Sequence, residues 1–377
     1  MLFNKYCKII MLILAIGLVG GSVGAMAEVK DKTAAKYRMP LEESKHEGTW
    51  LQWPHDYTYG EGHKSGLEPI WVEMTKALVK GEKVHLIVYN ESEKKEVQAV
   101  LANENIDMKM VDFNVFPTDD VWVRDNGPIF VYDQKKNLTI LNWGFNGWGN
   151  KTAYKKCAEI PKKVSEKLGY KRIDLKSVVL EGGSIELDGK GTCLATRSAI
   201  VNKNRNPKLS EKQIENSIKE NYGVKRFIWL DGVVGEDITD FHIDGFAKFY
   251  NDKTLITLKE DDLSDWGVTD KDIDRLLEAK DTTGKTYKHI YLPLTKENVY
   301  LESGTDLGYK GSYINYYIAN KVVLVPNYND QNDAVANQLI QKLYPDRQVV
   351  GIDVRELYKD GGMIHCVTQQ QPINLSK

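Results

Sequence analysis

The leading candidate for a catalytic residue is a cysteine near the carboxyl end of the chain. Cys366 follows the glycine pair Gly361-Gly362 in a short, strand-like run. Glycine allows the backbone to come close to another group, and a cysteine thiolate is a strong nucleophile. A buried structural cysteine gives the same local pattern, so the role of Cys366 depends on what the rest of the chain places beside it.

The segment 240–249 supplies a histidine and a carboxylate two positions apart. If Asp240–Phe249 forms a strand, His242 and Asp244 point to one face and most of its apolar side chains to the other. An imidazole beside a carboxylate is suited to proton transfer and to binding a cation. A polar strand face exposed to solvent is the alternative, because such pairs also occur for structural reasons.

Two further segments place charged groups where strands are expected to end. Asp125 precedes a glycine-proline pair. Trp122 lies three residues earlier, where its ring could line the wall around the aliphatic part of a substrate. The alternative for this segment is a surface ion pair between Arg124 and Asp125. Glu181 follows an apolar run, and because an unpaired buried charge is costly, we expect it to have a partner and to orient His242.

Composition and spacing argue against several other classes of protein. A net charge of −2 over 377 residues lacks the basic excess of a nucleic-acid-binding protein. The seven histidines are scattered, with no C-x-x-C or H-E-x-x-H spacing, so no metal is expected. No P-loop or G-x-G-x-x-G run occurs between a strand and a helix, so no cofactor is expected. The local signature of papain-like cysteine proteases is also absent.

The amino end has the composition of a secretory signal peptide, Met1–Ala27. Lys5 and Lys8 precede an apolar run over residues 9–19, and Ala25-Met26-Ala27 is a small-residue cleavage signal. This pattern predicts an exported protein, secreted or periplasmic, with no membrane segment once the signal is removed.

Residues 28–377 are then expected to form a single catalytic domain, since no linker or low-complexity tract divides them. This part of the chain contains Cys157, Cys193 and Cys366, which is too few for a disulfide framework. The sequence leaves open whether Cys157 and Cys193 pair and whether the chain forms a homo-oligomer.

Helix start signals recur along the chain at a nearly constant interval. Capping residues predict helix starts at residues 92, 152, 210, 269 and 330, about 60 residues apart, with the second helix running over Thr152–Leu168. Such a period, with strands between the helices, predicts an α/β fold of five copies of one unit closing into a ring. The strand candidates that bear on the site are Val121–Val131, Ser184–Ala195, Phe241–Tyr250 and Met363–Gln369.

Taken together, these motifs resemble those of the agmatine deiminases, in the guanidine-modifying superfamily that includes the bacterial-type peptidylarginine deiminases. The resemblance covers roughly residues 37–372, nearly the whole chain after the expected signal. The motifs that carry it are Trp50–Pro54, Trp122–Pro128, Asn142–Gly149, Glu181–Gly183, His242–Asp244, Ser312–Tyr317 and Ile364–Gln370.

The resemblance implies a five-fold pseudosymmetric α/β propeller, the pentein fold, and a covalent mechanism without cofactor or metal. It implies that Cys366 is the nucleophile and His242 the general acid and base. Asp125 and Asp244 would grip a guanidinium, and Glu181 would position His242. A small cationic guanidine is the expected partner, bound with the help of Trp122.

The same resemblance implies hydrolysis of agmatine to N-carbamoylputrescine and ammonia. The alternatives are an exported peptidylarginine deiminase that forms citrulline and a catalytically silent protein that binds guanidines. Three features depart from the family pattern: Phe241 stands where glycine is usual, Asp360–Met363 replaces a more glycine-rich run, and a signal peptide is expected.

Overall fold

The structure, a computed structural model, describes residues 35–376. The expected signal peptide, residues 1–27, lies outside the described residues. From Ala35 onward the chain forms one compact unit. Across residues 35–376, no helix is both long and apolar enough to cross a bilayer.

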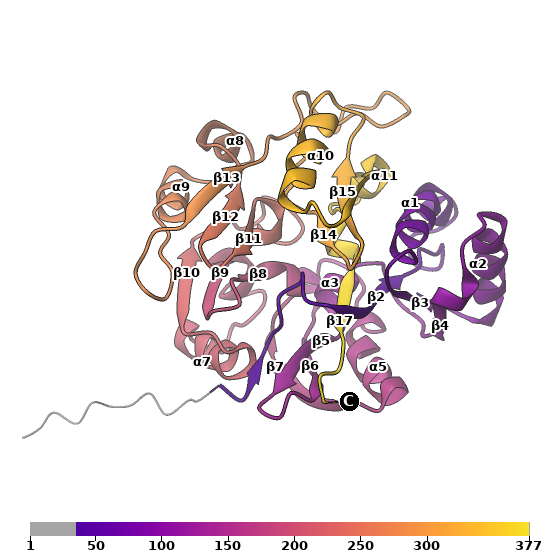
Figure 1. The fold of residues 1–377 in the computed structure, drawn as a ribbon, viewed down its shortest axis with the longest axis horizontal. Coiled ribbons are helices and arrows are strands. Elements are labelled where there is room, and N and C mark those ends of the chain that lie inside the picture. The colour runs from indigo at the N-terminus through magenta and orange to yellow at the C-terminus, as the bar shows by residue number, and fades with distance from the viewer. Residues whose placement is uncertain (1–34, 377) are drawn as a thin grey trace, which may run out of the picture. The chain divides into compact units, whose positions relative to one another are not determined.

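Five sheets in the described residues share one strand pattern: an antiparallel pair, to which a third strand is added in parallel. In sheet order the strands are β17 (Gln369–Pro372), β2 (His46–Gln52), β3 (Lys83–Val88) and β4 (Val111–Val115); β1 (Tyr37–Arg38), β5 (Ile129–Asp133), β6 (Leu138–Gly144) and β7 (Lys171–Val179); β8 (Ile185–Leu187), β9 (Thr192–Thr196) and β10 (Arg226–Leu230); β11 (Ala247–Asn251), β12 (Thr254–Thr257) and β13 (Lys288–Tyr291); and β14 (Tyr317–Ile318), β15 (Val322–Asn327) and β16 (Gln348–Asp353). The fold is therefore mixed α/β (Figure 1).

Helices make the crossover that each added parallel strand requires. They are α1 (His63–Leu78) before β3, α5 (Ile160–Leu168) before β7, α7 (Glu211–Tyr222) before β10, α8 (Glu260–Asp265) and α9 (Asp270–Leu277) before β13, and α10 (Asn332–Leu343) before β16. The apolar face of α1 follows the 3.6-residue period, and Leu67, Trp71, Met74 and Leu78 are buried.

The expected constant helix interval is wrong in two places. The helix near residue 92 is α2 (Glu91–Asn103), which makes a second crossover in its sheet, to the additional outer strand β4, whereas α1 makes the crossover to β3 that the other sheets share. The helix expected over Thr152–Leu168 begins only at Ile160, after a short 3-10 turn. The added α2–β4 segment and the loops between elements make the units unequal in length, so the helix starts do not measure the repeat.

Two of the predicted helix starts coincide with the observed N-caps, Ser210 and Thr269. Ser210 and Gln213 form the predicted capping box at α7. Thr269 precedes α9 as expected, without a side-chain cap. The cap of α2 is Asn90 rather than Ser92, because Asn90 accepts a hydrogen bond from the Glu93 amide.

The last strand of the chain joins one of the first. β17 pairs antiparallel with β2, with Gln369 opposite Trp50, and Figure 1 shows these two strands side by side near the middle of the view. The indole of Trp50 donates a hydrogen bond to the Gln371 side chain at 2.8 Å. This pairing fixes the segment that contains Cys366 against the strand that carries the first aromatic motif.

Three of the expected strands are interrupted by one helical turn. Val121–Val131 contains α3 (Val123–Asn126), Phe241–Tyr250 contains the 3-10 turn η4 (Ile243–Gly245), and Met363–Gln369 contains the 3-10 turn η5 (His365–Val367). A backbone hydrogen bond closes each turn before β5, β11 and β17 begin. These expectations were wrong because a three- or four-residue turn leaves no periodic signal in the sequence.

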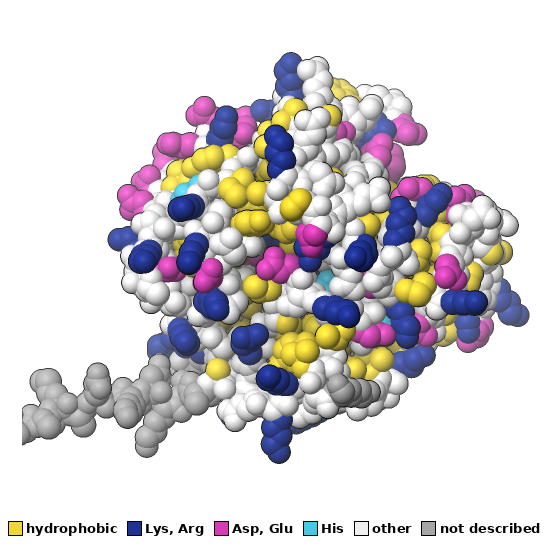
Figure 2. Space-filling view, viewed as in Figure 1, with side chains coloured by type: hydrophobic (Ala, Val, Ile, Leu, Met, Phe, Trp, Pro, Cys, Tyr) yellow, Lys and Arg dark blue, Asp and Glu magenta, His cyan; other side chains and the backbone are white. Residues whose placement is uncertain are grey.

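Charged side chains of both signs cover the surface. Figure 2 shows basic and acidic residues interspersed over the face in view, with small apolar patches between them. Among the described residues, large apolar side chains exposed to solvent are scattered and mostly tyrosines, such as Tyr57, Tyr59 and Tyr300. A surface of this kind is ordinary for a globular protein.

Candidate active site

In each sheet, a polar residue of the candidate site lies just before one strand of the antiparallel pair that receives the parallel strand. Asp125 lies in α3 before β5, Glu181 precedes η3 (Gly182–Ser184) and β8, and Asp244 lies in η4 before β11. Asn315 precedes β14, and Cys366 lies in η5 before β17. The turn α3 contacts η3 and η5, η3 also contacts η4, and Asn315 lies 3.5 Å from the Cys366 sulfur, so the five sheets bring these five side chains together.

Cys366 is buried among groups that favour its neutral thiol. Its Sγ atom lies 3.5 Å from Nδ2 of Asn315 and 4.0 Å from Oδ2 of Asp244. Burial, with the nearby carboxylates of Asp244 and Asp125, raises the pKa of Cys366 well above that of an ordinary cysteine. A cation placed beside these carboxylates would remove part of that effect and favour the thiolate.

His242 faces two carboxylates. Its Nε2 lies 3.0 Å from Oε2 of Glu181, and its Nδ1 lies 3.8 Å from Oδ1 of Asp125. Burial disfavours the charged ring, but the Asp125 charge and the hydrogen bond to Glu181 outweigh burial and raise the pKa of His242 to about 9. His242 is therefore a proton donor at neutral pH.

The two aspartates of the site are held by different partners. Asp125 accepts hydrogen bonds from the indole of Trp148 and the amide of Gly183, each at 3.0 Å. Burial raises the pKa of Asp125. For Asp244, burial is outweighed by the hydrogen bond and charge of His365, which lower its pKa. The Oδ2 atom of Asp244 lies 2.7 Å from Nδ1 of His365.

Gly183 forms the wall between three of these side chains. A Cβ atom at this position would lie 2.8 Å from Nδ1 of His242, 2.9 Å from Oδ2 of Asp244 and 3.0 Å from Oδ1 of Asp125. Real Cβ atoms do not approach other atoms so closely, so only glycine allows the two carboxylates and the imidazole to surround one point.

A buried ion-pair chain supports Glu181 from behind. Arg205 donates from Nε to Glu181 at 2.7 Å and from Nη1 to Asp240 at 2.6 Å, and the side chains of all three residues are almost fully buried. Asp240 also accepts hydrogen bonds from Asn204 and Gly235. The chain fixes the backbone immediately before His242.

The segment before His242 is locally strained. Asp240 and Phe241 have φ values of 60° and 79°, in the left-handed region. For a residue with a Cβ atom this conformation costs roughly 1–2 kcal/mol, which gives a physical reason for glycine at position 241 in the family pattern. The Phe241 ring packs against Phe246 with centroids 5.1 Å apart, and this contact offsets part of the cost.

A cavity of about 460 Å³ leads from the surface to the nucleophile. His242, Asp244 and Cys366 line it, and Asp125 and Glu181 lie next to His242, outside the lining. The remaining lining residues are Glu236, Asp237, Ile238, Thr239, Phe241, Gly245, Asp265, Trp266, Tyr309, Lys310, Tyr358, Lys359, Asp360, Gly361 and Met363.

Trp122 lies beside this cavity and does not line it. Its indole lines an adjoining cavity of about 250 Å³, which shares Ile238 and Asp360 with the first. Asp120 lies in the wall of the adjoining cavity and accepts a hydrogen bond from the Tyr59 hydroxyl at 2.5 Å. The structure thus brings together every expected site residue except Trp122, which lines the adjoining cavity.

Several residues of the site were not identified from the sequence. Asn315 and His365 lie inside quoted motifs, but their contacts with Cys366 and Asp244 join segments far apart in the chain. Arg205 and Glu42 lie outside all motifs. Arg124 is not a surface partner of Asp125, because it is buried and donates to the His365 carbonyl and the Gln370 side chain.

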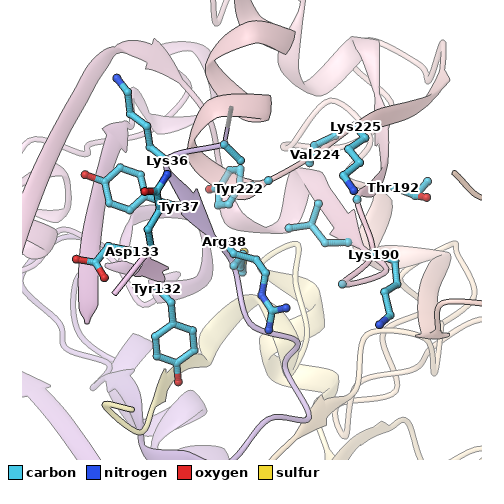
Figure 3. A pocket seen from close by; sticks show the side chains of 17 residues that line it. Lys36, Tyr37, Arg38, Tyr132, Asp133, Lys190, Thr192, Tyr222, Val224 and Lys225 are labelled. Atoms are coloured by element: carbon cyan, nitrogen blue, oxygen red, sulfur yellow. The ribbon is translucent and has the colours of Figure 1, made fainter. Parts of the chain in front are cut away.

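Among residues 35–376, the other thiols and cavities do not form a second site of this kind. Cys157, Cys193 and Cys366 are all free and buried, so Cys157 and Cys193 do not pair. A separate cavity of about 350 Å³ has four basic residues in its lining, Lys36, Arg38, Lys190 and Lys225, and the Lys36 side chain points away from those of Lys190 and Lys225 (Figure 3). In the part of the chain that the structure describes, no group of three or more candidate ligands is arranged to hold a metal ion.

Comparisons with known proteins agree on one group of relatives. Residues 38–372 match the profile of the Porphyromonas-type peptidyl-arginine deiminases. The chain is 31% identical to the agmatine deiminase of Pseudomonas aeruginosa over 357 residues, 89% of this chain and 95% of the relative.

Solved structures give the same result. The agmatine deiminase of Enterococcus faecalis has a TM-score of 0.81 at 27% identity, over 90% of this chain and 97% of that chain. The agmatine deiminase of C. jejuni with substrate bound has a TM-score of 0.76 at 28% identity, over the same shares of the two chains.

Proposed function

The chain belongs to the Porphyromonas-type peptidyl-arginine deiminase family, and we propose that it hydrolyses the guanidinium group of agmatine to N-carbamoylputrescine and ammonia. It is thus an amidine hydrolase that acts on a C–N bond. The observation that carries the proposal is the convergence of Cys366, His242 and Asp244 in the lining of one cavity, with Asp125 next to His242. The relatives that are agmatine deiminases support the choice of substrate.

Two carboxylates grip the guanidinium in this proposal. A guanidinium presents N–H donors in a plane, and the Asp125 and Asp244 carboxylates accept them from two sides. Trp148 and Gly183 hold Asp125, and His365 holds Asp244, so both acceptors are oriented before substrate binds. The grip keeps the unreactive guanidinium carbon close to the Cys366 sulfur.

Substrate binding activates the nucleophile. The same carboxylates that raise the pKa of Cys366 are neutralised by the bound guanidinium, so the thiol releases its proton to solvent more readily as the complex forms. The thiolate then attacks the guanidinium carbon and forms a tetrahedral adduct. The imidazolium of His242 protonates the departing nitrogen, and ammonia leaves.

A covalent thiouronium joins Cys366 to the remaining amidine. His242, now neutral, takes a proton from water as the water attacks the same carbon. The C–S bond breaks, the hydroxyl of the adduct releases its proton to solvent, the thiolate is restored, and the neutral ureido product leaves. Glu181 keeps Nε2 of His242 in place through both steps.

Trp122 contacts the aliphatic part of the substrate in this proposal. Its indole lies beside the junction of the two cavities, where it packs against the four-carbon chain of agmatine. The common strand pattern of the five sheets supports the finer fold assignment, a pentein propeller with five-fold pseudosymmetry. The position of a site residue just before the antiparallel pair of each sheet supports it as well.

The enzyme is expected to be exported, because residues 1–27 have the composition of a signal peptide. Export is testable by amino-terminal sequencing of the protein made in a bacterial host and fractionated into cytoplasm, periplasm and medium. A mature chain that begins at Glu28 in an exported fraction supports the proposal. Full-length protein in the cytoplasm alone would oppose it.

The substrate is tested by incubating the protein, and Cys366→Ala as a control, with agmatine, free arginine and a peptide with carboxyl-terminal arginine. We expect ammonia and a ureido product from agmatine, and none with the variant. Citrulline from the peptide with agmatine untouched would show a peptidylarginine deiminase instead. Binding of agmatine without turnover would indicate a silent guanidine-binding protein.

A further inference from the structure

His365, the residue before the nucleophile, lies between two carboxylates. Its Nδ1 lies 2.7 Å from Oδ2 of Asp244, and its Nε2 lies 2.8 Å from Oε2 of Glu42. The imidazole is buried, at 3% exposure. Because carboxylates of an ion-paired site only accept hydrogen bonds, both ring nitrogens must donate for both contacts to form. A neutral ring has one N–H, so the geometry fits the imidazolium.

Glu42 is itself anchored by several donors. Its Oε1 accepts a hydrogen bond from the Ile318 amide at 2.9 Å and lies 3.5 Å from Nζ of Lys248. Its Oε2 lies 3.5 Å from Nη2 of Arg124. Burial raises the pKa of Glu42, but the charges of Lys248 and His365 outweigh it and hold that pKa far below the usual range. Glu42 is therefore a fixed negative charge behind His365.

Asp244 uses one oxygen for His365 and keeps the other available. Within the described residues, Oδ1 of Asp244 has no protein hydrogen-bond partner, whereas Oδ2 has His365. Asp244 lines the catalytic cavity, and Glu42 and His365 line a smaller cavity of about 60 Å³. The imidazole thus lies between the catalytic cavity and a charged cluster at its back.

We propose that His365, held as an imidazolium by Glu42, is a positioning residue that keeps Asp244 ionised and directs its free oxygen at the substrate cation. The inference rests on the proposed function, because it assigns the support of a group that grips guanidinium. The hydrogen bonds from Glu42 through His365 to Asp244 orient the Asp244 carboxylate. Trp148 and Gly183 orient the Asp125 carboxylate in the same way.

The charge state of His365 also depends on the groups around the chain. Those that face it or its two carboxylates are Arg124, Lys248, Glu186, His242, Asp125 and Cys366. Lys248 lies 3.5 Å from both Glu42 and Glu186 and neutralises part of their charge. Of Glu42 and Glu186, Glu42 is the one that contacts the His365 ring directly.

The kinetic test is Glu42→Gln, with Glu43→Gln as a matched control. Glu43 is the half-buried neighbour of Glu42 and has no contact with His365. Loss of a charge-assisted hydrogen bond corresponds to about a tenfold effect, so we expect the KM for agmatine to rise about tenfold in Glu42→Gln, more than kcat falls.

A readout independent of turnover is the ¹⁵N spectrum of the histidine rings in the full chain, with His365→Asn to assign the signals. Because each ring nitrogen faces a carboxylate oxygen, we expect both nitrogens of His365 to carry a proton in the unliganded protein, and the Nε2 signal to change in Glu42→Gln but not in Glu43→Gln. A neutral ring at pH 7, or identical behaviour of the two variants, would overturn the proposal. Absence of turnover with a protonated ring would instead refute the proposed function alone.

Discussion

The Nε2 atom of His242 lies 3.0 Å from Oε2 of Glu181, and the other oxygen of that carboxylate accepts a hydrogen bond from Arg205 at 2.7 Å. The imidazole that must exchange protons is therefore held by a carboxylate that is itself fixed. This arrangement keeps His242 charged at neutral pH, and charge on His242 is what the first half of the reaction requires.

Replacing Glu181 by glutamine should weaken catalysis and shift its pH dependence. The hydrogen bond and charge of Glu181 help raise the pKa of His242 to about 9, so the acid form is lost at lower pH in Glu181→Gln. Hydrogen bonds to charged groups contribute roughly 1.5–3 kcal/mol, which predicts a fall in kcat/KM of about tenfold to a hundredfold. The measurement is the pH profile of kcat/KM between pH 6 and pH 10. Glu159→Gln, which removes only a surface ion pair, should leave the profile unchanged; an unshifted profile in Glu181→Gln would contradict this role.

Stability should also depend on the charge of His242. Its pKa in the folded protein, about 9, is higher than the roughly 6.5 of an unfolded chain. The charged ring therefore contributes stability that is complete below about pH 6.5 and is lost as pH rises to about 9. Thermal unfolding across this range should show a smaller decline of Tm in His242→Gln than in the wild type. Equal declines in the two proteins would show that His242 does not carry the effect.

Gly183→Ala should damage activity more than stability. The added Cβ would lie 2.8 Å from Nδ1 of His242 and 2.9 Å from Oδ2 of Asp244, so these groups must move apart. We expect at least a tenfold loss of kcat/KM, because about 1.4 kcal/mol of lost transition-state stabilisation is tenfold. Gly66→Ala in α1, where the nearest atom is 3.9 Å away, should keep full activity and gain about 0.5–1 kcal/mol in the free energy of unfolding. Equal kcat/KM in the two variants would rule out this steric account.

Two substitutions of Phe241 separate packing from backbone strain. Both Phe241→Ala and Phe241→Gly lose the contact with Phe246, but only glycine also relieves the strain of φ 79°. Phe241→Gly should therefore be more stable than Phe241→Ala by roughly 1 kcal/mol. Urea unfolding of both variants measures the difference. A less stable glycine variant would show that the left-handed backbone is not strained here.

The local motifs predicted which residues form the site better than they predicted its backbone. Asp125, His242, Asp244 and Cys366 were identified correctly as neighbours, because each stands in a short pattern of glycine, aromatic and charged residues. The backbone around them was predicted as strand, since alternating polar and apolar residues suggest period two. In the structure single turns carry Asp125, Asp244 and Cys366.

The supporting residues could not be found from the sequence. Glu42 and His365 are 323 residues apart, and neither has a local signal for its role. Arg205 stands in a polar loop where a charged residue is usually exposed, yet it is buried between two carboxylates. Such contacts form only when segments far apart in the sequence come together in the fold. No pattern within a single segment therefore predicts them.

The most direct test of the account is covalent labelling of the unmodified protein with a haloacetamidine, followed by mass spectrometry of its peptides. The reagent carries an amidinium that the Asp125–Asp244 pair should bind and a carbon that the Cys366 thiolate should attack. We predict one adduct, on Cys366, which agmatine suppresses and Asp244→Asn slows, while the buried Cys157 and Cys193 remain unlabelled. Labelling of the three thiols at similar rates, or no protection by agmatine, would contradict a guanidinium site built around Cys366.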